Sequence, residues 1–127
     1  TGNPRSRYVA DLIGVNLLRG VVIGDVLATD RGLDVHLADP ADGAVFATIP
    51  PGAVAVHRRE PEGSPRNRWP AVIARLDVLG DRVRVHLAPP VELVAEITPA
   101  ALAELELREG DDVWVSVKAT EVRASPV

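Results

Sequence analysis

The chain has 127 residues, enough for one domain or two small ones, and its 46% hydrophobic and 25% charged composition is that of a folded globular protein. Without cysteine it has no disulfide, thiol nucleophile or cysteine-ligated zinc, and no apolar run approaches the roughly 18 residues that a membrane span requires. A net charge of −4 and an aromatic content of 3% argue against a nucleic-acid-binding surface.

The first predicted element is a short helix near the N-terminus. The chain opens without an initiator Met, which suggests a fragment or a processed chain. From Pro4 to Gly14 apolar residues recur at helical spacing, and Ser6 is placed to cap the helix. These apolar residues are Tyr8, Val9, Leu12 and Ile13.

Short strand-like segments follow, and they recur as two copies of one pattern. Three matches occur in the same order, and the spacing between matched residues grows late in the second copy, between Thr98 and Gly110. The sequence therefore predicts a duplicated unit with an insertion in its second copy. The matched segments are Asn16–Val22 with Asn67–Ile73, Val35–Leu37 with Val85–Leu87, and Ala55–Arg58 with Ser116–Ala119.

Alternation of apolar and polar residues predicts strands within each copy. Val113, Val115 and Val117 alternate with Trp, Ser and Lys, and β-branched residues favour strands. Gly-containing turns at residues 30–32 and 79–81 are typical of hairpins. Several short strands at close spacing predict a mostly β fold, built as a small barrel or sandwich.

The insertion in the second copy has the pattern of a helix. Thr98 stands at the cap position, Pro99 at the first helical position, and Ala and Leu continue to Leu105. Between the two copies, residues 60–67 are polar and rich in Pro and Gly, so we expect a loop there. That loop either binds a ligand or is a plain linker.

Catalysis has no support in the sequence. The three histidines, His36, His57 and His86, are best explained as strand residues at the surface, because none lies in a metal-binding spacing. No phosphate loop and no Gly-x-Ser-x-Gly motif occurs. We therefore expect neither enzyme activity nor a metal-cation site.

The groups that best suit a ligand are donors to an anion. Ser64, Arg66 and Asn67 would supply a hydroxyl, a guanidinium and an amide from the loop, and Lys118 and Thr120 follow a strand at the far end of the same copy. Lys118 is the only lysine, which hints that a compact point charge is needed there. A tetrahedral dianion needs several such donors. The alternative is a solvated loop, a turn and an edge-strand charge that discourages aggregation.

Two of these segments resemble the signatures of a known family. Ser64-Pro65-Arg66-Asn67 resembles the Ser-x-Arg-Asn signature of the molybdate-binding Mop domain, and Ser116–Val122 resembles its closing Val-Lys-Ala-Ser/Thr-x-Val signature. Gly110–Val113 is similar to the turn before the last strand of that domain. Two units in tandem resemble a di-Mop arrangement, a form of the TOBE domain. Residues 4–16 are similar to the segment that joins the nucleotide-binding domain to the regulatory tail in importer ATPases.

The resemblance implies a C-terminal di-Mop/TOBE regulatory domain of the ATP-binding subunit of a molybdate ABC importer. Its fold would be two OB-like β-barrel units packed in tandem, with a short helix at the N-terminus and one inserted in the second unit. The implied domains are a linker helix over residues 1–15, a first unit over 16–62 and a second over 63–127. The implied oxyanion-binding residues are Ser64, Arg66, Asn67, Lys118, Ala119 and Thr120.

The resemblance also implies partners. Molybdate or tungstate would be the ligand, ATP would bind only on a domain that this chain lacks, and the tail would act as a homodimer beside membrane permease subunits. The protein would be cytoplasmic, at the inner face of the cell membrane, and would inhibit transport when cytosolic molybdate is high. No nucleic acid is expected.

The first copy departs from the family pattern. It keeps only Asn16 of the opening signature, and Val56-His57-Arg58-Arg59 stands where the closing signature is expected. Pro65, at a signature position, has no backbone N–H to offer. Two alternatives to the regulatory tail stay open: a freestanding di-Mop molybdate-storage protein and, with less support, an oligonucleotide-binding barrel.

Overall fold

The computed structural model describes residues 14–63 and 67–127. Most of the predicted linker helix over residues 1–15, together with Ser64 and Arg66, lies outside the described residues. The described part is mostly β structure with a single α-helix, which confirms the prediction of a mostly β fold.

The two halves of the chain carry the same sequence of elements. The first half contains five strands and one 3₁₀ helix: β1 (Asn16–Ile23), β2 (Val26–Thr29), β3 (Asp34–His36), β4 (Gly43–Ile49), η1 (Pro51–Ala53) and β5 (Ala55–His57). The second half repeats this order and adds a helix: β6 (Asn67–Leu79), β7 (Arg82–Leu87), β8 (Val94–Ile97), α2 (Pro99–Leu105), β9 (Asp112–Val117), η2 (Ala119–Glu121) and β10 (Arg123–Pro126).

Helix α2 forms where its capping residues predict it. The Thr98 side chain accepts a 3.1 Å hydrogen bond from the backbone N–H of Ala101, and Pro99 occupies the first turn, where a missing N–H costs nothing. The helix ends at Glu106, which adopts the left-handed conformation with φ 51°. The predicted helical insertion in the second copy is therefore confirmed, between β8 and β9.

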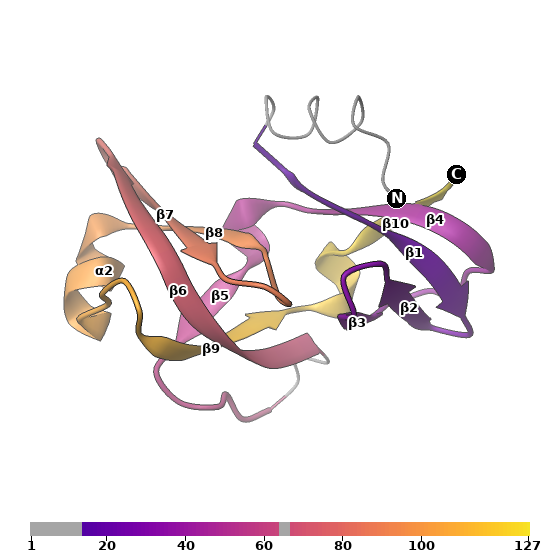
Figure 1. Ribbon diagram of the computed structural model, residues 1–127, viewed down its shortest axis with the longest axis horizontal. Coiled ribbons are helices and arrows are strands. Elements are labelled where there is room, and N and C mark those ends of the chain that lie inside the picture. The colour runs from indigo at the N-terminus through magenta and orange to yellow at the C-terminus, as the bar shows by residue number, and fades with distance from the viewer. Residues whose placement is uncertain (1–13, 64–66) are drawn as a thin grey trace.

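The strands form two antiparallel five-stranded sheets of the same topology. Their orders are β10-β4-β1-β2-β3 and β5-β9-β6-β7-β8. Figure 1 shows them next to each other along the long axis of the molecule, with α2 at the outer end of the second sheet. Each edge position beside β4 or β9 is filled by a strand from the other half of the chain, so the two sheets are tied together by strand exchange.

This exchange crosses the predicted boundary between residues 62 and 63. Strand β5 comes before the boundary and pairs with β9, with Val56 opposite Val115. Strand β10 lies at the end of the chain and pairs with β4, with Ala124 opposite Ala47. The division into units 16–62 and 63–127 stays a prediction about the chain, whereas each sheet contains residues from both sides of it.

The repeated topology tests the three sequence matches. Asn16 and Asn67 open the equivalent strands β1 and β6, so the first match is confirmed. The second is wrong, because residues 35–37 lie at the edge strand β3 and residues 85–87 in the inner strand β7. Short Val-rich strands resemble one another whatever their place in a sheet, and the short hairpin β1–β2 has a much longer counterpart in β6–β7.

The third match is also wrong, and its correction bears on the site. Val117-Lys118-Ala119 leads from β9 into η2, and the equivalent passage in the first half leads from β4 into η1 through Ile49-Pro50-Pro51. Proline thus stands where the second half has Lys118. The segment at residues 55–58, which we matched to it, contains the exchanged strand β5 instead.

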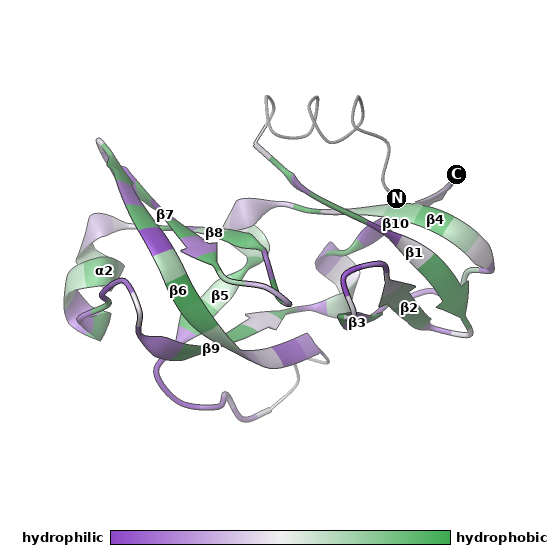
Figure 2. Ribbon diagram, in the orientation of Figure 1, coloured by the Kyte–Doolittle hydropathy of each residue, from purple (hydrophilic) through white to green (hydrophobic). Residues whose placement is uncertain are grey.

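One hydrophobic core lies between and within the sheets. It contains fully buried side chains from both halves, among them Leu18, Leu27 and Ile49 of the first half and Ile73 and Val85 of the second. Burying one such side chain stabilises the fold by about 1.5–3 kcal/mol. Figure 2 shows the alternation of hydrophobic and hydrophilic residues along β6 that this arrangement requires.

Candidate anion-binding site

Asn67 at the start of β6 lies beside the end of β9, where the closing signature is found. Asn67, the last residue of the opening signature, is paired in register with Val117. Lys118 follows directly and precedes η2, which begins at Ala119 and contains Thr120. The sheet therefore brings the closing signature beside Asn67, although Val117 and Asn67 lie 50 positions apart along the chain.

The side chain of Asn67 forms its hydrogen bonds with the other sheet. Its side chain is 1% exposed, its Oδ1 accepts a hydrogen bond from the His36 N–H at 2.6 Å, and its Nδ2 donates to the His36 carbonyl at 2.9 Å. Asn16 has the reciprocal arrangement, because its side chain bonds the backbone N–H and carbonyl of Val94 on β8. Both asparagine side chains therefore hold the two sheets together by hydrogen bonds, and we call such a residue a clamp.

The remaining predicted residues differ in exposure and surroundings. Ala119 is 8% exposed, whereas Lys118 and Thr120 are exposed. Lys118 lines a cavity of about 600 Å³, and Thr120 lines a different one of about 530 Å³ beside residues 37–41. The structure therefore places these two side chains at separate cavities, and it does not describe Ser64 and Arg66.

The Lys118 cavity holds two polar residues that were not among the predicted ligands. His57 Nε2 lies 2.7 Å from Ser116 Oγ, and both side chains line the cavity with Lys118. Ser116 was detectable in principle, because it stands two residues before Lys118 on the same strand face. His57 was not, because only the pairing of the exchanged strand β5 with β9 brings it there.

Charge at this cavity is mixed. The carboxylates of Glu62 and Glu121 line it together with the Lys118 ammonium. A protonated His57 would balance them, since a His ring carries its second proton only in the cationic form. A dianion bound here therefore requires cations beyond Lys118, which a neighbouring segment or a second copy of the chain would have to supply.

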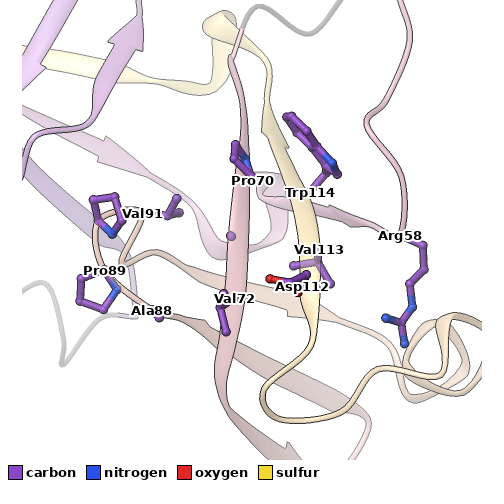
Figure 3. A pocket seen from close by; sticks show the side chains of 11 residues that line it. Arg58, Pro70, Val72, Ala88, Pro89, Val91, Asp112, Val113 and Trp114 are labelled. Carbon is purple, nitrogen blue, oxygen red and sulfur yellow. The ribbon is translucent and has the colours of Figure 1, made fainter.

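A further cavity, of about 400 Å³, is mostly apolar. Figure 3 shows Pro70 and Val72 of β6 and Trp114 of β9 in its wall, with Pro89 and Val91 on one side. Arg58 lies on the opposite side of these strands. Its guanidinium donates to the Leu105 carbonyl and to the Asp111 carboxylate, each over less than 3 Å, so it serves the fold.

Two carboxylates have lowered pKa values. The Arg108 N–H and the Arg58 guanidinium hold the pKa of Asp111 below its ordinary value, against an opposing effect of desolvation. Desolvation raises the pKa of Asp77, but hydrogen bonds from His86 and Arg75 outweigh it, so the net direction is downward. Both carboxylates stay ionised at neutral pH.

Within residues 14–63 and 67–127 no cluster of three or more His, Asp or Glu side chains could hold a metal ion. In the same part of the chain no helix has the length and apolar character to cross a bilayer.

Comparison with known proteins finds a matching domain and two groups of relatives. Residues 63–124 match the TOBE domain. The molybdenum import ATP-binding protein ModC of Mycobacterium tuberculosis is 40% identical over 132 residues, which cover 97% of this chain and 36% of that protein. The molybdate/tungstate import ATP-binding protein WtpC of Pyrococcus abyssi is 31% identical over 123 residues, or 95% of this chain. The chain thus spans about a third of the length of these relatives.

Among solved structures, the cytoplasmic molybdate-binding protein ModG with molybdate bound has the same fold. Its TM-score is 0.75, and the match covers 88% of this chain and 96% of that one at 18% identity. At this identity the likeness concerns the fold. The sequence matches are more specific: residues 63–124 match the TOBE domain, and the chain matches the C-terminal region of the molybdenum and molybdate/tungstate import ATP-binding proteins ModC and WtpC.

Proposed function

We propose that this chain is an oxyanion-binding regulatory tail of a molybdate or tungstate importer, made of two OB-like Mop units. The observation that carries the proposal is the pairing of Asn67 with Val117, which sets the last residue of the opening signature beside the closing signature. If these were unrelated loop and edge-strand residues, nothing would require the two segments to meet. The matches to ModC and WtpC support molybdate or tungstate as the ligand.

The site in this proposal is made of Ser64, Arg66 and Asn67 from the opening signature, with Asn67 in a positioning role, and of Lys118, Ala119 and Thr120 from the closing one. A tetrahedral dianion leaves water only if fixed donors and positive charge replace its hydration. Lys118 supplies charge from the β9–η2 junction, and Arg66 supplies a second cation. Because Asn67 holds β3 through both its amide groups, its part is to position the loop before it.

The mixed charge around Lys118 supports a site completed by a second copy. Glu62 and Glu121 line the same cavity, so one ammonium does not suffice for a dianion. A homodimer that places the opening signature of one chain against Lys118 of its partner would add the missing guanidinium. Such a tail would act on the cytoplasmic face of the membrane, beside the permease subunits, with ATP bound on a separate domain.

Regulation in this proposal is a coupling between two sites. Molybdate inhibits transport only if it binds more tightly to a transporter state that does not transport. The test is ATP hydrolysis by the reconstituted full transporter with and without molybdate, compared with a Lys118→Ala variant. We expect inhibition in the wild type and its loss in the variant. Equal inhibition of both would contradict the proposal.

The freestanding storage protein is the competing proposal. Its support is the extent of the fold match with ModG, which covers nearly all of that chain. Against it stand the relatives of higher sequence identity, which are ATP-binding proteins about three times as long as the matched segment. An immunoblot of the native protein distinguishes the two, because only the tail is part of a much larger polypeptide.

A further inference from the structure

A cavity of about 440 Å³ lies where the two halves of the chain meet, away from Lys118. The first half contributes the start of β1, the β2–β3 turn and η1, and the second half contributes β6, β7 and β8 with the loop between them. Among the described residues it shares no lining residue with the Lys118 cavity. Anything bound here would therefore occupy a different site from the one proposed for molybdate.

The lining of this cavity is basic. Arg31, Arg75 and Arg84 contribute three guanidinium groups, and Glu92 contributes the only carboxylate among its described lining residues; His86 adds a ring that can become cationic. The carboxylates that pair with these groups, Asp77 with Arg75 and His86, and Glu96 with Arg84, do not line it. Basic groups therefore outnumber carboxylates in the described lining itself, while Asp77 and Glu96 pair with the basic groups from outside it.

Arg31 and Arg84 differ in the hydrogen bonds that their guanidinium N–H groups make. Arg31 Nη1 donates to the Glu92 carbonyl at 2.8 Å, and its Nη2 donates to the Leu17 carbonyl at 3.2 Å, so it holds the rim of the cavity together. Arg84 Nε is buried and has no hydrogen-bond partner in the described structure, and Glu96 Oε1 is 3.7 Å from it. A buried polar group without a partner is rare and calls for an explanation.

Gly14 adds a second constraint on the Arg84 guanidinium. A Cβ built on Gly14 would lie 2.8 Å from Arg84 Nη2, so the tip of the Arg84 side chain lies close to the Gly14 backbone at the edge of the cavity. The planar fork of this guanidinium matches two oxygens of one anion.

We propose that this cavity binds a compact, multiply charged oxyanion of the phosphate type, with Arg84 as its principal donor. Arg75 and His86 lie on the same wall, with Arg75 Nη2 3.2 Å from His86 Nε2, and both side chains pair with Asp77. An anion there would meet the Arg84 guanidinium and bridge the two halves. Binding should therefore stabilise the interface that Asn16 and Arg31 also hold.

The direct test is titration of the whole chain with inorganic phosphate at low ionic strength, followed by NMR of arginine Nε–Hε groups. We expect the Arg84 Nε–Hε resonance to shift with phosphate and the melting temperature to rise. The absence of an Arg84 shift at millimolar phosphate would overturn the proposal. This readout needs no substitution, so it holds even if variants at residue 84 fail to fold.

Calorimetry of variants locates the site. Arg84→Gln should weaken phosphate binding about tenfold or more, the loss of a charge-assisted hydrogen bond, and Arg84→Lys should restore part of it. The matched control is Arg82→Gln, which removes the same charge from the same strand and the same partner, Glu96, but does not line the cavity. Equal losses in Arg84→Gln and Arg82→Gln would show nonspecific charge attraction only.

Lys118→Ala separates this site from the proposed molybdate site. We expect it to bind phosphate within about twofold of the wild type, because the two cavities share no residue. If phosphate binding falls in Lys118→Ala and not in Arg84→Gln, phosphate occupies the Lys118 cavity and the present proposal is wrong. Molybdate titration of the same variants reports on the proposed function independently.

Discussion

The Asn67 side chain, on β6 of one sheet, closes a pair of hydrogen bonds on the backbone of His36, on β3 of the other. Because both groups are buried by the contact, replacing Asn67 with Ala would leave an N–H and a carbonyl without partners. We expect Asn67→Ala to lower the free energy of unfolding by about 1–3 kcal/mol in denaturant titrations.

The symmetry of the fold supplies the control for this variant. Asn16→Ala removes the reciprocal pair of bonds to Val94 and should destabilise by a similar amount. The exposed residue Arg59 should tolerate Ala without a measurable change. An Asn67→Ala chain as stable as the wild type, yet defective in molybdate binding, would show that Asn67 is a ligand-binding residue and not a clamp.

Gly20 lies where β1 passes closest to its neighbour β2. A Cβ at this position would stand 2.0 Å from the Ala28 carbonyl oxygen, which is backbone and cannot rotate away. We therefore expect Gly20→Ala to cost at least about 1–3 kcal/mol, the usual range for overpacking a tight site. Gly52→Ala is the control, since a Cβ there meets nothing within 4 Å. Equal melting temperatures for the two variants would contradict this account of Gly20.

Acid sensitivity should depend on Asp111. The Arg108 N–H and Arg58 lower the pKa of its carboxyl in the folded state below 3.8. Its stabilising contribution is thus complete above that value and is lost as the pH falls through the folded-state pKa. We expect Asp111→Asn to be less stable than the wild type at pH 6 and to lose less stability between pH 4 and pH 2. The measurement is the free energy of unfolding across that range.

Asp42→Asn is the companion variant, because Asp42 is an exposed carboxylate with no ion pair seen in the described structure. It should follow the wild-type curve. If Asp111→Asn also follows it, the contacts from Arg58 and Arg108 contribute nothing to acid stability.

How far the sequence predicts this molecule depends on the range of the interactions. Helix α2 was predictable because Thr98 and Pro99 act on the next few residues. The exchange of β5 and β10 was not, since a strand of three or four residues carries no mark of its partner. For the same reason, the prediction that the closing segment of the first copy lies at residues 56–59 was wrong. In the structure that place is taken by Pro50, which has neither a charge nor an N–H.

The candidate site likewise has a part that the sequence predicted and a part that it did not. Lys118 was singled out by sequence as the one lysine among 14 basic residues, and the fold places it at a cavity. His57 reaches that cavity only through strand exchange, and the carboxylate of Glu62 comes from the loop between the halves. The binding signatures were therefore readable as short motifs, whereas the charge balance around them depends on long-range pairing.

The sharpest test of the site is Lys118→Ala. In our proposal its ammonium meets a dianion that has lost part of its water, so removing it should weaken molybdate binding by about 1.5–3 kcal/mol, or roughly ten- to a hundredfold. Calorimetric titration of the chain with molybdate measures the change. The control is Arg59→Ala, an exposed cation that lines none of the cavities described above. If both variants lose affinity equally, the chain attracts molybdate by general charge. If Lys118→Ala binds as the wild type does, the pocket lies elsewhere.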